Sequence, residues 1–307
     1  MKKIDFHVHH HNAVTVKEAI AYFRDMMERK GYCGICVQSF LHHRGNFYPD
    51  GNQIAMEIAE GLPDSYAFAG LDHNRDFVEQ TKEYMAQGFR GIKLLEGKPS
   101  EWRANGGLNY GDPRFDAFFA YCEAEQIPIL IHNNDPLVNW DITKADARAI
   151  EQGWVYDETV PSQEWFFEQL ENALLAHPNL RVALAHFGFY ADNLPRAELL
   201  MEACPNLYMD ITPAICIFPE LSRTPEASEN FFRKYHTRIF YGTDADSALV
   251  GFAREYNDLK TTIITHFLEG DTPKDIEGRW IHPIRLEREM LENIYYNNAM
   301  RFMEREP

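Results

Sequence analysis

The chain has 307 residues, of which 45% are hydrophobic and 13% aromatic, so it can bury a substantial core. Its formal net charge of −17 repels nucleic-acid phosphates and anionic lipid, so we expect neither nucleic acid nor a membrane as a partner. The odd number of cysteines, five, scattered in apolar stretches, indicates reduced thiols in a cytoplasmic protein. The start Met1-Lys2-Lys3 leads directly into a strand-like segment, so we expect no secretory signal peptide.

Short aliphatic or β-branched runs alternate along the chain with longer amphipathic segments. In chain order the predicted strands are 4–8, 34–40, 65–72, 89–97, 127–134, 180–188, 206–214 and 237–246. The predicted helices that follow them are 16–31, 52–62, 75–88, 112–126, 162–178, 194–205, 224–236 and the C-terminal region. Eight strand–helix units in series predict an α/β protein, a (β/α)8 TIM barrel that forms a single domain over residues 1–307. A doubly wound open sheet is the alternative, but no G-x-G-x-x-G sequence follows any strand.

Two long segments without a regular pattern follow predicted strands, at about 41–52 after the second strand and 133–160 after the fifth. Loops of this length in a compact domain are usually functional. Because both leave the carboxyl ends of strands, we expect them to cover the active-site face. Arg44 and Trp140 lie on these loops, and we predict that they contact an aromatic or carboxylate-bearing substrate, with plain surface or packing roles as the alternative.

Polar side chains stand at the carboxyl ends of several predicted strands. They are His7 and His9 on the first strand, His132 on the fifth, His186 on the sixth and Asp244 on the eighth. The carboxyl ends of the strands carry the active site of a (β/α)8 barrel. Several imidazoles and a carboxylate that meet there suit a divalent metal, zinc first, with manganese or iron as alternatives.

The tract His7 to His11 contains four histidines, and strand geometry divides them. Alternate residues of a strand point the same way, so His7 and His9 are predicted to face the barrel interior. The same alternation predicts that three apolar residues point the opposite way: Ile4, Phe6 and Val8. His10 points away from the interior, whereas His11 shares the parity of His7 but lies past the strand end, where it faces the substrate or solvent.

Six stretches resemble the amidohydrolase superfamily, in particular its amidohydrolase 2 branch: IDFHVH, GFRGIKLL, IPILIH, HPNLRVALAHFG, RIFYGTDAD and ENIYYNNAMRFM. That branch contains metal-dependent hydrolases and relatives of aminocarboxymuconate-semialdehyde decarboxylase. The resemblance runs nearly end to end and implies a (β/α)8 fold with one divalent metal on four ligands: His7, His9, His132 and Asp244. It also implies that His186 acts on the substrate or on the bound water. A homodimer is a family-level expectation only.

Lys93 on the fourth strand leaves the number of metals open. Phosphotriesterase-like enzymes have a carboxylated lysine there that bridges two metals. PHP phosphoesterases and TatD-type nucleases fit less well, because their closing Asp-x-His and fourth-strand Glu are replaced here by Asp244-Ala245-Asp246 and Lys93. We expect one metal, since the remaining motifs fit the mononuclear branch. A buried ammonium needs an anionic partner, which we predict to be a substrate carboxylate, Asp210 or Asp5.

These residues allow three functions. The first is a metal-dependent hydrolase of a C–O or C–N bond, such as a lactone or amide of a small carboxylic acid, with Asp244 as the base and His186 at the carbonyl or leaving group. The second is a metal-dependent, non-oxidative decarboxylase of a small aromatic or dienoic acid on the same site. The third is a non-enzymatic metal-binding protein, which would leave a complete set of strand-end ligands without a purpose.

Overall fold

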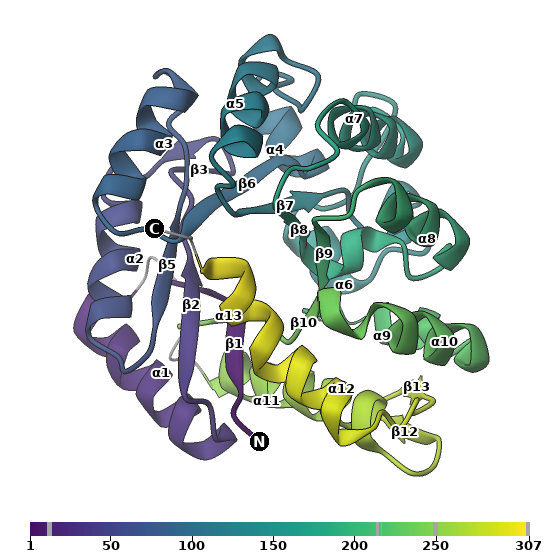
Figure 1. The fold of residues 1–307 in the computed structure, drawn as a ribbon. Coiled ribbons are helices and arrows are strands. Elements are labelled where there is room, and N and C mark those ends of the chain that lie inside the picture. The colour runs from purple at the N-terminus through teal and green to yellow at the C-terminus, as the bar shows by residue number, and fades with distance from the viewer. Residues whose placement is uncertain (11–13, 213–214, 216, 248–250, 305–307) are drawn as a thin grey trace.

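The computed structural model describes residues 1–10, 14–212, 215, 217–247 and 251–304. Within these residues, nine parallel strands form one sheet with helices around it (Figure 1). In the order in which they pair, the strands are β10 (Ile239–Phe240), β9 (Leu207–Asp210), β8 (Val182–Leu184), β7 (Ile129–Asn133), β6 (Gly91–Gly97), β5 (Tyr66–Ala69), β2 (Gly34–Gln38), β1 (Ile4–His9) and β11 (Ala245–Asp246). Every predicted strand position is therefore occupied by at least one strand.

The sheet closes on itself through the last predicted strand. Residues 237–246 form two short strands, of which β10 pairs with β9 and β11 pairs with β1. Between them, Phe6 N donates to Tyr241 O over 3.1 Å, and Asp244 N donates to His7 O over 2.8 Å. The predicted (β/α)8 barrel is confirmed, whereas the prediction of one unbroken strand over 237–246 is wrong.

The predicted helices surround the sheet, except that the last of them crosses one end of the barrel (Figure 1). They are α1 (Val16–Lys30), α2 (Gly51–Glu60), α3 (Phe77–Ala86), α5 (Pro113–Ala124), α7 (Gln163–Ala176), α8 (Leu194–Ala203), α10 (Pro225–Tyr235), α11 (Gly251–Glu269), α12 (Arg288–Glu292) and α13 (Asn298–Met303). Three further short helices lie in connections: α4 (Pro99–Ala104), α6 (Ala147–Glu151) and α9 (Ile217–Leu221). A hairpin of β12 (Lys274–Ile276) and β13 (Arg279–Ile281) precedes α12.

Local sequence signals set several helix ends. At the start of α1, the Thr15 side chain accepts a hydrogen bond from Glu18 N, and the Glu18 carboxylate accepts one from Thr15 N, which is a capping box. Gly31 ends α1 in the left-handed conformation, with φ of 71°. The side chains of Asp76 and Ser162 cap α3 and α7 by accepting from Glu79 N and Trp165 N, respectively. These signals involve residues close together in the chain. The predicted bounds of these helices therefore agree with the observed ones to within a few residues.

One hydrophobic core fills the amino-terminal end of the barrel interior. It contains Phe6 of β1, whose ring centroid lies 4.6 Å from that of Phe240 and 5.6 Å from that of Phe68. Helix α13 crosses this end of the barrel and adds Phe302, 5.7 Å from Phe6 (Figure 1). This layer forms a floor beneath the histidines, so the site above it is reached from the carboxyl ends of the strands.

The position of Phe6 corrects one prediction. Ile4 and Phe6 were predicted to point away from the barrel interior together with Val8, yet both lie in the interior core, and only Val8 packs between the sheet and the helices. The cause is a register shift between β1 and β2, which falls between Asp5 and Val8 and interrupts the alternation of the strand.

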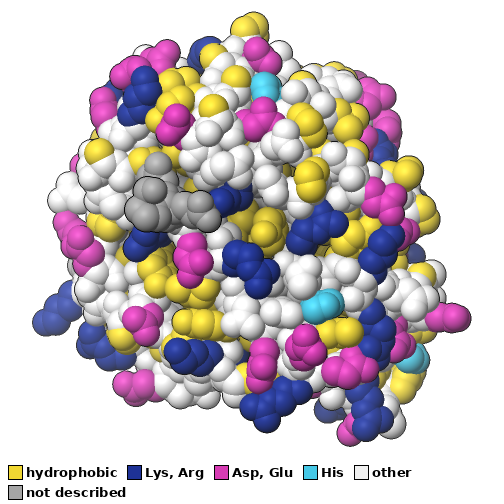
Figure 2. All heavy atoms as spheres, in the orientation of Figure 1, with side chains coloured by type: hydrophobic (Ala, Val, Ile, Leu, Met, Phe, Trp, Pro, Cys, Tyr) yellow, Lys and Arg dark blue, Asp and Glu magenta, His cyan; other side chains and the backbone are white. Residues whose placement is uncertain are grey.

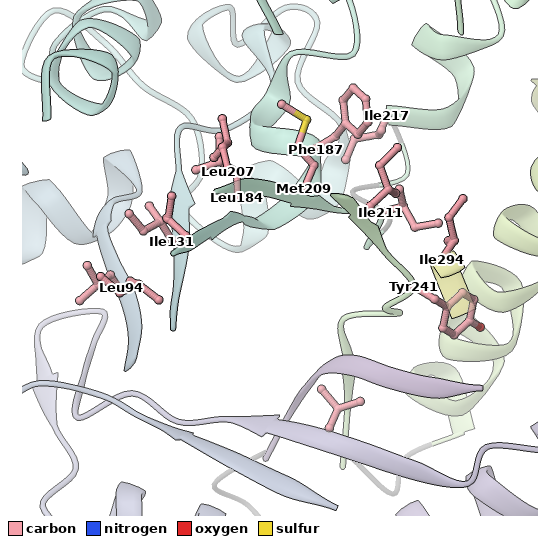
Figure 3. Close-up of a cluster of buried hydrophobic side chains, with 14 of the residues drawn as sticks. Leu94, Ile131, Leu184, Phe187, Leu207, Met209, Ile211, Ile217, Tyr241 and Ile294 are labelled. Carbon is pink, nitrogen blue, oxygen red and sulfur yellow. The ribbon is translucent and has the colours of Figure 1, made fainter. Parts of the chain in front are cut away.

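A larger core lies between the sheet and the helices (Figure 3). Leu94, Ile131, Leu184 and Met209 point into it from four neighbouring strands, and Phe187 joins them from the turn after β8. Since Ile92 also packs here, Lys93 between Ile92 and Leu94 points into the barrel interior. The two cores together fix which strand residues reach the interior.

The two long segments over the carboxyl face contain regular structure that the sequence did not indicate. Residues 41–52 include a hairpin of β3 (His42–His43) and β4 (Asn46–Phe47), and residues 133–160 include the helical turn Leu137–Trp140 and α6. The segments are joined where Arg44 Nη2 donates to Gln152 Oε1 over 2.5 Å.

Acidic and basic side chains are interspersed on the face seen in Figure 2. None of the helices in the described ranges has both the length and the hydrophobicity that crossing a bilayer requires.

Candidate metal centre

His7 and His9 turn their Nε2 atoms toward each other at the carboxyl end of β1. His7 is fully buried, its Nδ1 lies 2.7 Å from Asp210 Oδ2, and its Nε2 lies 2.9 Å from His9 Nε2. His9 Nδ1 lies 2.9 Å from the Gln38 carbonyl oxygen. Because a carbonyl or carboxylate oxygen accepts hydrogen bonds, both Nδ1 atoms carry the hydrogen. Each neutral ring therefore directs an Nε2 lone pair at the other.

Asp244 completes this group. Its Oδ1 lies 3.4 Å from His9 Nε2 and 3.8 Å from His7 Nε2. One ligand atom from each of the three residues lies within 4.8 Å of the others. Two nitrogen lone pairs and a carboxylate oxygen so close together repel one another unless a cation lies between them. The three residues therefore fit a divalent metal.

The charge states of the three residues also suit a metal. Burial lowers the pKa of His7 well below its usual value and that of His9 to about 4, so both rings are neutral near pH 7. Burial acts to raise the pKa of the Asp244 carboxyl, but opposing effects, of which the charge of Lys260 is the largest, hold that pKa below its usual value. Neutral imidazoles and an ionised carboxylate are the forms in which these residues bind metals.

His132 and His186 form a second pair of imidazoles, with His186 Nε2 3.1 Å from His132 Nδ1. The Thr212 hydroxyl donates to Asp210 Oδ1 over 2.6 Å, so it accepts from His186 Nδ1 over 2.7 Å. His132 Nε2 donates to the Asn134 carbonyl oxygen over 3.1 Å. Again two unprotonated nitrogens face each other, so this pair also has free donor atoms for a cation or for one shared proton.

The structure places the predicted ligand His132 differently from the other three. It contacts His186 and does not belong to the close group of His7, His9 and Asp244. The pair lies next to that group, because the His186 ring stacks on His7 with centroids 5.5 Å apart. His186 was predicted at the end of a strand, but β8 ends at Leu184, and His186 follows in a left-handed turn with φ of 57°.

Asp210, at the end of β9, organises both pairs of histidines. Its Oδ2 accepts from His7 Nδ1, and its Oδ1 accepts from His186 N over 2.8 Å and from Thr212 N over 3.1 Å. A carboxylate that orients an imidazole in this way raises its basicity as a ligand. From the sequence, Asp210 is predicted only as a partner for Lys93. Its position at the end of a strand could also have indicated a role in the site.

Lys93 is buried, with 2% of its surface exposed, and Nζ has no hydrogen-bond partner within the described part of the chain. Neither predicted protein partner is bonded to it, because Asp210 binds the histidines and Asp5 binds Thr243. Burial lowers the pKa of Lys93 to about 8, although the charges of Asp210 and Asp244 act to raise it. An ammonium in this position is available to an anion that enters the site.

Lys260 of α11 is a neighbour of Asp244 that sequence reasoning missed. Its Nζ donates to the Asp244 carbonyl oxygen over 2.5 Å and lies 3.9 Å from Asp244 Oδ2. Its side chain is 5% exposed. In the sequence it is one more lysine on an amphipathic helix, 16 residues after Asp244, and no local pattern marks it.

The remaining predicted substrate contacts have partners within the loops. The Arg44 guanidinium binds Gln152 and lies 5.8 Å from the centroid of the Trp154 ring. Trp140 Nε1 donates to the Pro161 carbonyl oxygen over 3.1 Å, and the Trp140 ring packs 4.8 Å from Tyr156. The structure does not bring either side chain to the histidines. His11 lies outside the described residues.

We expect the purified protein to contain about one divalent metal per chain, because only one close group of ligands occurs among the described residues. Elemental analysis of protein prepared without added metal will measure this. Dialysis against a chelator should abolish turnover, and zinc or manganese should restore it. Metal-free protein that remains fully active would contradict the assignment.

Solved structures share the fold at low identity. A 2,6-dihydroxybenzoate decarboxylase from Rhizobium matches with 14% identity and a TM-score of 0.53, over 98% of each chain. A dihydroxybenzoic acid decarboxylase from Polaromonas sp. JS666, with bound manganese and the inhibitor 2-nitroresorcinol, matches with 13% identity and a TM-score of 0.55, over 98% of this chain and 96% of that one. The apo IDCase of Metarhizium anisopliae matches with 13% identity and a TM-score of 0.55, over 94% of this chain and 79% of that one.

None of the curated proteins compared with the chain matches it. The family model described as amidohydrolase, of the amidohydrolase 2 branch, matches residues 4–305. The match includes every strand of the barrel and all the histidines and carboxylates discussed above. The chain therefore belongs to the amidohydrolase 2 family.

Proposed function

We propose that the protein is a metal-dependent decarboxylase that removes CO2 from a small aromatic acid without oxidation. The observation that carries this proposal is the unpaired, buried ammonium of Lys93. Burial is the main cause of the low pKa of His7, and the positive charge of Lys93 is the next cause. A buried cation without a protein partner favours an anionic substrate, and a carboxylate supplies that charge.

The proposed reaction needs a proton and a site with little water. The ring carbon that bears the carboxylate gains one proton, the bond to the carboxylate carbon breaks with its electron pair returning to the ring, and CO2 leaves. Asp244 and His186 are the groups able to hold and move that proton. A divalent metal, zinc or manganese, would supply a Lewis acid at His7, His9 and Asp244, with His132 as a further proposed ligand. The similar folds of the dihydroxybenzoate decarboxylases, one of which binds manganese, support this choice.

Hydrolysis of a lactone or amide of a small carboxylic acid is the second candidate. It is favoured by the low pKa of Asp244, which keeps the carboxylate ionised beside two neutral imidazoles. Such a carboxylate is suited to accept a proton from an attacking water. The side chain of Asp244 is 30% exposed and that of His9 is 17% exposed, so water can reach this edge of the site.

A substrate screen separates the two candidates. Metal-loaded protein would be incubated with dihydroxybenzoates and related aromatic acids, and separately with small carboxylate-bearing lactones and amides. We expect CO2 release, measured with a coupled bicarbonate assay, from at least one aromatic acid and only with metal present. Lactone or amide turnover without CO2 release from any acid would contradict the decarboxylase and support the hydrolase.

A further inference from the structure

Asp244 has an unusual backbone conformation. It lies in the break between β10 and β11 with φ of 53°, in the left-handed region, which residues with a side chain rarely adopt. From this backbone position Asp244 Oδ1 lies 3.8 Å from His7 Nε2 and 3.4 Å from His9 Nε2. Contacts elsewhere must therefore hold the break in place.

Asp5 supplies such contacts from the middle of β1. Its side chain is fully buried, Oδ1 accepts from Thr243 N over 2.9 Å, and Oδ2 accepts from the Thr243 hydroxyl over 2.5 Å. Oδ1 also accepts from His7 N over 3.3 Å. One carboxylate thus connects the backbone of His7 to the residue just before Asp244.

The Thr243 hydroxyl makes hydrogen bonds that flank Asp244. It donates to Asp5 and accepts from Ala245 N over 3.2 Å, so it fixes the residues on both sides of Asp244. Asp244 N itself donates to the His7 carbonyl oxygen over 2.8 Å. Losing the hydroxyl would remove one hydrogen bond on each side of Asp244 while leaving the Asp244 carboxylate itself unchanged.

We propose that Asp5 and Thr243 are positioning residues that fix the Asp244 carboxylate relative to His7 and His9 and thereby set the metal affinity of the site. This inference rests on the proposed metal centre. Groups that orient a metal-binding side chain without binding the metal themselves typically contribute 10- to 100-fold to metal affinity.

The test compares Thr243→Val, which removes the hydroxyl and keeps the shape, with Thr243→Ser, which keeps the hydroxyl. The matched control is Thr81→Val on α3, because Thr81 is equally buried and its hydroxyl donates to Phe77 O over 2.7 Å far from the site. Titration of each chelator-treated protein with Mn²⁺, followed by the electron paramagnetic resonance signal of free Mn²⁺, gives the affinity.

We expect Thr243→Val to bind Mn²⁺ 10- to 100-fold more weakly than the wild type, and Thr243→Ser and Thr81→Val to bind within about threefold of it. The melting temperature should fall by a similar amount in Thr243→Val and Thr81→Val. A general loss of stability would therefore not explain a difference in metal affinity between these two variants. The visible spectrum of Co²⁺-loaded protein should change in Thr243→Val only.

Unchanged Mn²⁺ affinity and Co²⁺ spectrum in folded Thr243→Val would overturn the proposal while leaving the metal centre intact. A wild-type protein that binds neither Mn²⁺ nor Co²⁺ would overturn the metal centre and this proposal with it. If Thr243→Val does not fold, Asp5→Asn decides, since it keeps the shape of the side chain but removes an acceptor oxygen. Wild-type affinity in Asp5→Asn would then count against the proposal.

Discussion

Replacing Asp244 by asparagine should lower kcat/KM by about 10³-fold while the protein remains folded. The amide keeps the size of the side chain but cannot hold a proton as a carboxylate does, and it offers a metal one neutral oxygen instead of a charged one. The loss is expected for a decarboxylase and for a hydrolase, because Asp244 serves both. Steady-state kinetics with a substrate found in the screen, together with circular dichroism, measures it.

Asp72→Asn is the control for that variant. Asp72 also follows a barrel strand, and its carboxylate lies 3.4 Å from His42 Nε2, outside the candidate metal centre. Its loss should leave kcat/KM within a few-fold of the wild type. If Asp244→Asn retained wild-type activity, the proposed role of Asp244 would be wrong under either function.

Replacing Lys93 by methionine should have opposite effects on activity and stability. The kcat/KM for a carboxylate substrate should fall roughly 10²-fold, because a buried charge-assisted contact with the substrate is lost. The free energy of unfolding should rise, since methionine fills a similar volume without a buried, unpaired charge. Kinetics and urea unfolding on the same preparations would measure both.

The stability gain should depend on pH in a defined direction. The folded-state pKa of Lys93 is lowered from 10.5 to about 8, so at neutral pH the ammonium destabilises the folded state. At 1.4 kcal/mol per pKa unit, Lys93→Met should gain up to about 3.5 kcal/mol at pH 7. Between pH 8 and 10.5 the folded wild type has released a proton that the unfolded chain still holds, so wild-type stability rises and the gain shrinks.

Lys98→Met provides a matched contrast. Lys98 is similarly buried, but its Nζ lies 2.7 Å from Asp135 Oδ1. Removing this ammonium leaves a buried carboxylate without its charged partner, which should destabilise the protein by roughly 3 kcal/mol. If Lys93→Met were destabilised as much as Lys98→Met, Lys93 would have a protein partner, and the argument for an anionic substrate would fail.

The sequence by itself determined the order of strands and helices and the strand ends that carry His7, His9 and His132. It could do so because alternation along a strand and capping at a helix end depend on neighbours within a few residues. The same local rule was wrong for Ile4 and Phe6, since the register shift in β1 arises from pairing with β2. The break between β10 and β11 that contains Asp244 was not predicted either, because closing the barrel joins residues more than 200 positions apart.

Only the tertiary structure decided which atoms face one another in the site. The Nε2 atoms of His7 and His9 converge because Asp210 and the Gln38 carbonyl hold the opposite ring nitrogens. Likewise, Lys93 is unpaired because its predicted partners Asp210 and Asp5 are bonded to other groups. Each of these facts depends on hydrogen bonds between different strands, whose partners are chosen by the closed barrel and not by the residues next to them in the chain.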